Sequence, residues 1–301
     1  MSRGKIVVVG GSGFLGSHVA DSFSRAGHDV TIVDVQPSPW RSSDQKEIIA
    51  DVRDLEALKS AFAGAGTILN FSGIADIAAA GRDPIRTMEI NILGTVNTIE
   101  AALQCGVKRY LFASTVYVYS DQGGFYRASK QACEAIIRTY GEERGLAYTV
   151  LRYGTLYGRR AGPTNRIRAM VVEALRSKRI SYPGSGQAMR DFIHVNDAAA
   201  LTVRALDPAY AGHEILITGQ ERTKVADIAR MISEILMNKV EMNFADGEPE
   251  GHYLLTPYSF SPSLSYKLVP NHYVDIGQGL LDCIQEAWGQ EHPGEEIAPP
   301  G

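Results

Sequence analysis

The sequence predicts an α/β protein with a doubly wound parallel sheet, followed by a smaller C-terminal α/β lobe. Short β-branched runs alternate with helical stretches as far as Arg152, which is typical of parallel sheets with right-handed crossovers. A glycine-rich turn follows the first run, and the alternation changes after about Gly158. We therefore expect two intertwined domains and a disordered tail: 1–157 with about 190–218, then 158–189 with 219–290, then 291–301.

The composition excludes several classes of function. The chain has 301 residues, 45% of them hydrophobic, and a net charge of −4, so neither nucleic acid nor an anionic membrane is an expected partner. Three widely spaced cysteines and scattered histidines predict neither a disulfide framework nor a metal site. The N-terminal apolar run is too short for a signal peptide, and no run reaches the ~18 apolar residues of a membrane span. We expect a soluble, cytoplasmic protein.

The first strand leads into a turn that suits a dinucleotide. Lys5–Val9 is the strand, and Gly10, Gly13 and Gly16 follow it. Glycines at this spacing allow a tight turn, close approach of a pyrophosphate and close packing of helix on strand. The N–H groups at the start of the next helix then face the phosphates. This pattern predicts a Rossmann-like fold.

An acidic residue selects the cofactor. Asp34 ends the second strand, Asp29–Val33, about 20 residues beyond the turn, as the dinucleotide fingerprint requires. Its carboxylate can accept hydrogen bonds from both ribose hydroxyls and would repel a 2′-phosphate. NAD is therefore favoured over NADP.

The alternation then continues to the middle of the chain. Asn91, within a long helix, has two interpretations: a satisfied core amide or a contact with the active-site strand. The expected elements are strand 48–50, helix 55–63, strand 67–71 closed by Ser72 and Gly73, helix 83–105, strand 110–114, helix 126–144 and strand 147–152. Ligands bind at the carboxyl ends of such strands. The residues expected at that edge are Gly10–Gly16, Asp34, Asp51, Ser72, Ser114 and Tyr153.

One stretch carries the residues of a proton-transfer site. The strand ending at Ser114 and Thr115 precedes a helix with Tyr126 and Lys130, which share a helix face because they are four residues apart. An adjacent ammonium lowers the phenol pKa from about 10, so that Tyr126 can exchange a proton with a substrate hydroxyl. Thr115 can donate to the same oxygen. A chance pair on a solvated helix face is the alternative, but a hydride carrier encoded nearby favours alcohol–ketone chemistry.

The motifs together resemble a known family. VVVGGSGFLGSH, DVRD, NFSG, NILGTVNTIEAA, FASTVYVYS, YRASKQACE, LRYGTLYG and GSGQAMRDFIHVND occur in that order over about residues 5–240. The chain thus resembles the extended short-chain dehydrogenases/reductases, in particular the NAD-dependent nucleotide-sugar epimerases and dehydratases similar to UDP-glucose 4-epimerase.

The resemblance implies roles for individual residues. Lys130 would bind the nicotinamide ribose, Ser114 would face the nicotinamide, and Thr115 would assist Tyr126. Arg190 would bind a substrate diphosphate, because its fork of donors suits an anion. The residues expected to line NAD are Gly10, Gly13, Phe14, Leu15, Gly16, Asp34, Asp51, Val52, Phe71, Ser72, Gly73, Asn91 and Tyr153.

Two positions after Thr115 indicate the reaction. Related dehydratases carry an Asp-Glu pair there and decarboxylases a Glu, whereas this chain has Val116 and Tyr117. Without a carboxylate, loss of water lacks its catalyst, so epimerisation is the leading hypothesis, most simply at C4 of a UDP-hexose. A ketoreductase or dehydrogenase acting on a sugar or related alcohol is the alternative, and a non-catalytic NAD-binding sensor or scaffold is a third.

Three departures from the family concern the substrate. Thr155 replaces a common Asn that contacts the diphosphate, 250–252 replaces an Arg-containing element, and the segment 120–125 is short. The resemblance also implies a homodimer formed by the helices that carry Asn91 and Tyr126, although the apolar positions on these helices are equally compatible with an internal core. These positions are Ile99, Ala102, Cys133 and Ile137.

Overall fold

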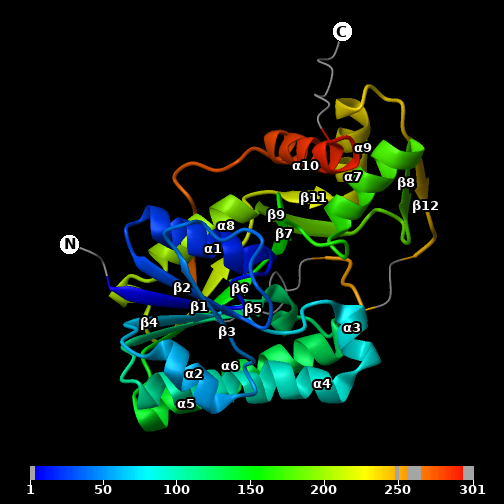
Figure 1. The fold of residues 1–301 in the computed structure, drawn as a ribbon. Helices are drawn as coiled ribbons and strands as arrows, with labels where there is room; N and C mark the ends of the chain where they lie inside the picture. The colour runs from blue at the N-terminus through cyan, green and yellow to red at the C-terminus, as the bar shows by residue number, and fades with distance from the viewer. Residues whose placement is uncertain (1–3, 248–250, 256–265, 294–301) are drawn as a thin grey trace. The chain divides into compact units, whose positions relative to one another are not determined.

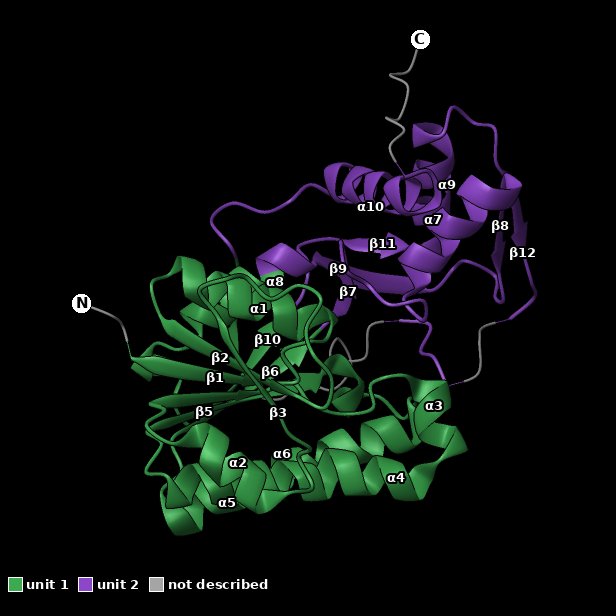
Figure 2. Cartoon of the chain, in the orientation of Figure 1, with its two compact units in different colours: residues 1–153, 198–217, 257–269 green, residues 154–197, 218–256, 270–301 purple. Residues whose placement is uncertain are grey.

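The computed structural model describes residues 4–247, 251–255 and 266–293. The chain forms two compact units (Figure 2), each assembled from three segments. Unit 1 comprises residues 1–153, 198–217 and 257–269, and unit 2 comprises 154–197, 218–256 and 270–301. The first segment of unit 1 ends at residue 153, where the sequence predicted 157, and the second begins at residue 198, where the sequence predicted about 190. The reason is that the strand Met189–His194 pairs with strands of unit 2.

Unit 1 is built on an eight-stranded sheet in the order β13-β10-β6-β5-β4-β1-β2-β3. All the pairings are parallel, as the sequence predicted. The strands are β1 Lys5–Val9, β2 Asp29–Asp34, β3 Lys46–Ile49, β4 Thr67–Asn70, β5 Arg109–Thr115, β6 Tyr148–Tyr153, β10 His213–Ile217 and β13 Tyr266–Lys267. The strand order reverses between β1 and β4, which is where such sheets open a ligand crevice.

Helices cover both faces of this sheet (Figure 1). On one face lie α1 Phe14–Arg25 and α8 Val195–Arg204, and on the other lie α2 Leu55–Phe62, α5 Gly94–Gln104 and α6 Gly124–Arg144. Their apolar sides form a core with the strands. The four positions suggested for a dimer face are 0% exposed within this core. They are therefore internal packing positions: Ile99, Ala102, Cys133 and Ile137.

The long helix expected over 83–105 contains a wider turn. Pro84–Met88 (α4) passes into a π-helical segment, Glu89–Leu93, and then into α5. Asn91 lies in this segment, and its carbonyl accepts from the Thr95 hydroxyl (2.6 Å) and the Cys133 thiol (3.1 Å). Wider turns of this kind are frequent at functional sites. A short helix, α3 Ile77–Arg82, precedes α4.

In the described residues of unit 2, three helices pack on two small sheets. One sheet has the order β11-β9-β7 and the other pairs β12 with β8. The strands are β7 Thr155–Tyr157, β8 Arg179–Tyr182, β9 Met189–His194, β11 Arg222–Lys224 and β12 Glu241–Phe244, and the helices are α7 Arg166–Ser177, α9 Val225–Ile235 and α10 Ile276–Glu291. The helices and strands share one apolar core. The prediction that the disordered tail begins at residue 291 is wrong at its start, because Glu291 is the last residue of α10; from residue 294 the expected tail lies outside the described residues.

Candidate active site

The glycine turn after β1 leaves no room for a side chain at Gly10 or at Gly16. Gly10 has a φ of 76°, and a Cβ there would lie 2.6 Å from the backbone nitrogen of Ser72. A Cβ on Gly16 would overlap the carbonyl oxygen of Gly10. The turn is closed by a hydrogen bond from the Gly13 N–H to Gly10 O (3.2 Å). Both glycines are therefore required by the backbone itself.

The start of helix α1 fits a pyrophosphate. Gly13 is its N-cap, and within the described residues no side chain caps it. Phe14 and Leu15 open the helix, and its first turn contains no acidic residue. The amide N–H groups and the positive end of the helix dipole are thus left for an anion. This arrangement fits the dinucleotide that the sequence predicted.

Asp34 lies at the end of β2, beside this turn. Its two carboxylate oxygens accept hydrogen bonds from the backbone N–H groups of Ser12 (3.0 Å) and Val35 (2.8 Å). Each oxygen keeps further acceptor capacity. The carboxylate is therefore held in place and suited to accept ribose hydroxyls.

The next predicted residues differ in their surroundings. Asp51 pairs with Arg53 at 2.6 Å, and this hydrogen bond holds the pKa of the Asp51 carboxyl below its ordinary value. Val52 is buried against Gly94, where a Cβ would lie only 2.5 Å from Val52 Cγ2. The backbone around Val52, and not its side chain, is thus what this turn offers to a ligand.

Asn91 links the loop after β4 to helix α6. Its side-chain oxygen accepts from the Ile74 N–H (2.7 Å), and its amide donates to Ile74 O (3.1 Å) and to Ser129 Oγ (2.9 Å) on α6. Gly73 lies against this amide and has a φ of 142°. Of the two interpretations of Asn91, the structure shows the satisfied core amide, which holds the loop that follows Phe71 and Ser72.

Thr115 and Tyr126 form the hydroxyl pair that the sequence predicted. Thr115 is the last residue of β5, and its side chain hydrogen-bonds that of Tyr126. Burial raises the pKa of Tyr126 to about 12, and the hydrogen bond with Thr115 opposes this shift. The ring of Tyr117 meets that of Tyr126 edge-on, with centroids 6.3 Å apart. The three side chains thus form one cluster at the carboxyl end of β5.

Lys130 differs from the sequence-based prediction. Its ammonium donates to the carbonyl of Ala113 (2.8 Å) and lies 4.6 Å from the centre of the Phe112 ring. Burial lowers its pKa, and Cys133 and Glu134 oppose this shift. The prediction of a lowered Tyr126 pKa is wrong for this arrangement, because Lys130 is held by the strand while burial dominates at the phenol.

A buried ion pair beneath this cluster was not predicted. Glu134 on α6 is 3% exposed and pairs with Arg152 on β6 at 2.6 Å. The Ser114 hydroxyl donates to Glu134 (2.6 Å), and Arg152 donates to the Tyr119 hydroxyl (2.6 Å). The pair therefore connects β5, β6, α6 and the turn that carries Tyr117. No spacing in the sequence signals this pair, because its members lie on a helix and a strand and are 18 residues apart in the chain.

The remaining predicted residues lie in both units. Tyr153 in unit 1 shares a hydrogen bond with Thr202 (2.6 Å), and its ring lies 6.3 Å from that of Phe71. Thr155 and Arg190 belong to unit 2, on strands β7 and β9. Arg190 is 6% exposed, and its Nη1 donates to Met189 O (3.0 Å).

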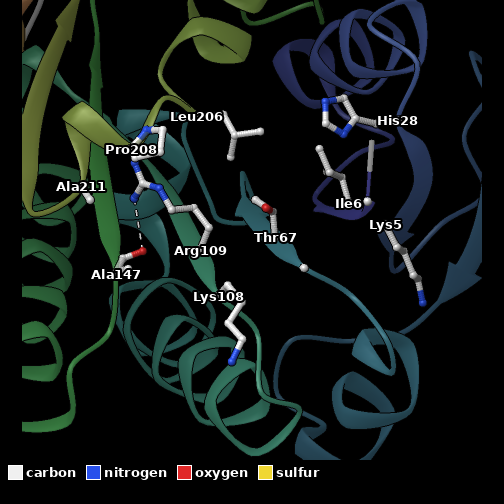
Figure 3. Close-up of a pocket in the computed structure, with 12 residues that line it drawn as sticks. Lys5, Ile6, His28, Thr67, Lys108, Arg109, Ala147, Leu206, Pro208 and Ala211 are labelled. Carbon is white, nitrogen blue, oxygen red and sulfur yellow. Dashed lines mark hydrogen bonds between the residues drawn. The ribbon is translucent and has the colours of Figure 1, made fainter. Parts of the chain in front are cut away.

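A cavity of about 450 Å³ lies where the strands of the unit 1 sheet begin, opposite to the carboxyl ends of these strands (Figure 3). Lys5, Thr67, Arg109 and Ala147 line it at the starts of strands. Arg109 donates to Ala147 O (3.2 Å) and to Thr149 Oγ1 (2.6 Å), so the protein itself holds its guanidinium. None of the predicted site residues lines this cavity.

Residues 6–218 match the NAD dependent epimerase/dehydratase family. The chain belongs to this family. It is 28% identical, over 77% of its length and 80% of the relative's, to a UDP-N-acetyl-alpha-D-glucosaminuronate decarboxylase of Bacillus cytotoxicus. It is 27% identical, over 71% of its length and 75% of the relative's, to a UDP-glucose 4-epimerase of Rhizobium meliloti. Family members that catalyse different reactions are thus about equally similar to this chain.

Solved structures agree on the fold. The Thermus thermophilus UDP-glucose 4-epimerase in complex with NAD has a TM-score of 0.79 at 23% identity, covering 95% of this chain and 99% of that one. A Bacillus cereus UDP-glucuronic acid 4-epimerase in complex with UDP-glucuronic acid and NAD reaches 0.83 at 23% identity, again covering 95% and 99%. The family and its α/β fold are therefore confirmed.

Two further properties concern the described residues alone. Among them, no group of three or more His, Cys, Asp or Glu side chains could hold a metal ion. Within the same residues, no helix is both long enough and apolar enough to cross a membrane.

Substitution of Gly16 by Ala is expected to weaken NAD binding by at least about tenfold. The added Cβ would overlap Gly10 O and displace the turn that faces the pyrophosphate. Titration calorimetry with NAD measures the effect. Gly81→Ala is the control for the general effect of a glycine-to-alanine substitution, because a Cβ there meets nothing within 4 Å and the φ of Gly81 is not positive. Equal NAD affinity for wild type and Gly16→Ala would contradict the assignment.

Proposed function

We propose that the protein is an NAD-dependent nucleotide-sugar epimerase, most simply of the UDP-hexose 4-epimerase type. The observation that carries this proposal is the hydrogen-bonded pair of Thr115 and Tyr126 at the carboxyl end of β5. Family membership supports it, because the Rhizobium meliloti relative is a UDP-glucose 4-epimerase.

In this proposal, unit 1 binds NAD and unit 2 binds most of the substrate. The turn from Gly10 to Gly16 and the start of α1 hold the pyrophosphate, and Asp34 holds the adenosine ribose. Asp51 with Val52 borders the adenine, while Phe71, Ser72, Gly73 and Tyr153 line the remaining path. Bound NAD supplies the acceptor and donor of a hydride.

The protein's own side chains handle the proton. In its phenolate form, Tyr126 Oη takes the proton of the sugar hydroxyl while the C–H hydride leaves, and it returns that proton to the sugar oxygen after the hydride has been delivered to the opposite face. Because burial raises the pKa of this phenol to about 12, the phenolate depends on the positive charge of Lys130. Thr115 orients the phenol through its hydrogen bond. Lys130, held by Ala113 O, contributes a positive charge near the nicotinamide ribose, and Ser114 lies at the same strand end.

The residues after Thr115 favour epimerisation over elimination. Val116 is buried and apolar, and Tyr117 packs its ring against that of Tyr126. Neither side chain provides a carboxylate to remove a proton next to the keto group or to protonate a leaving hydroxyl. Transfer of a hydride out and back needs no such group.

Arg190 supports the assignment of an anionic substrate. Its buried guanidinium has no carboxylate oxygen within 4 Å among the residues that the structure describes. A buried cation is stabilised by a counter-charge, and a diphosphate provides one. Thr155 on the neighbouring strand β7 completes the substrate side in this proposal.

A homodimer and a cytoplasmic location also belong to the proposal. With Ile99, Ala102, Cys133 and Ile137 in the core, support for a dimer comes instead from Ile85, which is 75% exposed, and Leu93, which is 49% exposed. Both lie on the stretch from α4 through the π-helical segment. Sedimentation equilibrium of wild type against Ile85→Glu tests this, and a monomeric wild type would exclude a dimer.

Product analysis tests the reaction. The purified protein is incubated with NAD and a panel of nucleotide sugars, and the products are separated and weighed by mass spectrometry. We expect a new isomer of unchanged mass from at least one UDP-hexose. A product lacking water, or one gaining two hydrogens when NADH replaces NAD, would contradict epimerisation. No product from any nucleotide sugar would contradict the substrate class.

A further inference from the structure

Tyr253 covers the buried guanidinium of Arg190. The Arg190 Cζ lies 4.2 Å from the centre of the Tyr253 ring, and Tyr253 is itself only 5% exposed. Contact between a guanidinium and an aromatic face is favourable, and more so when both are desolvated. The ring therefore fixes the plane of a side chain that would otherwise have many rotamers.

The Tyr253 ring is fixed in turn by Thr155. The two side chains are joined by a hydrogen bond. Thr155 lies on β7 opposite Phe192 of β9, two residues after Arg190. Burial raises the pKa of the Tyr253 phenol, and Arg190 opposes that shift, so the hydroxyl is neutral and able to donate or accept near pH 7. Thr155, Tyr253 and Arg190 thus form one contiguous set within unit 2.

The arrangement leaves part of Arg190 available. Nη1 donates to Met189 O (3.0 Å), and among the described residues Nε and Nη2 have no hydrogen-bond partner. An aromatic ring over one face of the plane leaves the N–H groups at its edge pointing outward. Those donors have the fork geometry that binds two oxygens of a phosphate at once.

We propose that Tyr253, anchored by Thr155, is a positioning residue that holds Arg190 ready for the diphosphate of a nucleotide sugar. This inference rests on the proposed function and adds residues to its substrate site. The inference also gives a role to Thr155, which stands where related enzymes carry Asn. Its side chain hydrogen-bonds Tyr253, and the Tyr253 ring orders Arg190. Ordering Arg190 before binding reduces the entropy lost on binding.

The test measures binding of UDP to the NAD-loaded protein by titration calorimetry. Tyr253→Leu removes ring and hydroxyl, and should raise the UDP Kd by about threefold to thirtyfold. Tyr253→Phe keeps the ring and loses the anchor, so a smaller rise is expected, and Thr155→Val should match it. The matched control is Tyr140→Phe in unit 1, which removes a hydroxyl bonded to Glu100 (2.6 Å) and should leave UDP binding unchanged.

Steady-state kinetics separate positioning from general damage. KM for the nucleotide sugar should rise with the UDP Kd while kcat changes less than twofold. If Tyr253→Leu does not fold, Tyr253→Phe and Thr155→Val carry the test. UDP affinity equal to wild type in these variants, in an enzyme that still converts nucleotide sugars, would overturn this inference alone. A wild-type protein that neither binds UDP nor converts any nucleotide sugar would overturn the proposed function as well.

Discussion

Replacing Tyr126 with Phe is expected to lower kcat by about 10²- to 10⁴-fold, the usual contribution of a positioned proton-transfer group. The substitution removes only the hydroxyl, which hydrogen-bonds Thr115, and keeps the ring that packs against Tyr117. The fold and NAD binding should therefore persist. Turnover is measured by product formation from the active nucleotide sugar, and bound NAD is released by heat and quantified.

A matched phenol far from the chemistry provides the control. Tyr140→Phe on the same helix loses a hydrogen bond to Glu100 and should keep near wild-type turnover. Retention of kcat in Tyr126→Phe, with NAD bound, would exclude Tyr126 as the proton-transfer group. A non-catalytic sensor predicts no turnover in either wild type or variant and unchanged NAD binding in both, so comparing the two proteins separates the two classes of function.

Replacing Glu134 with Ala is expected to lower the free energy of unfolding by about 3–5 kcal/mol, the cost of leaving one member of a buried ion pair without its partner. Arg152 is 6% exposed and would lose the carboxylate at 2.6 Å, and the Ser114 hydroxyl would lose its acceptor. Denaturant unfolding of wild type and variant measures the difference.

Arg138 supplies a contrasting substitution on the same helix. Its guanidinium lies 3.6 Å from Glu134 and 3.1 Å from Glu214, with a side chain that is 40% exposed. Arg138→Ala should cost less than Glu134→Ala, because the Arg138 side chain is 40% exposed and Glu134 would keep its pair with Arg152. A loss of similar size for Glu134→Ala would show that the buried pair is not a principal stabilising element.

Local patterns predicted unit 1 well because its elements are long and regular. The apolar run before Gly10 and the helical stretch after Gly16 correspond to β1 and α1, and the parallel sheet is confirmed. Unit 2 was predicted only in part. Its strands β7 and β11 have three residues each, and β9 is buried at nearly every position, so neither length nor alternation marks them.

The site shows a similar division. The hydroxyl pair of Thr115 and Tyr126 follows from a strand end and a helix start, which are visible in the sequence. The position of the Lys130 ammonium does not, because it depends on competition between the phenol, the Ala113 carbonyl and the Phe112 ring. Tyr253 could not be paired with Arg190 from spacing, since they are distant in the chain and no periodic pattern contains Tyr253.

The order in which the unit 1 sheet can assemble follows from its strand order. β6 ends at Tyr153, but its outer neighbour β10 begins only at His213, after a long part of unit 2. During synthesis on the ribosome, the edge of β6 therefore emerges well before the strand that pairs with it. A fragment ending near residue 157 would keep that edge open, and unpaired edges promote association between chains. Such a fragment is expected to aggregate, and the nascent protein is expected to depend on chaperones until β10 has been made.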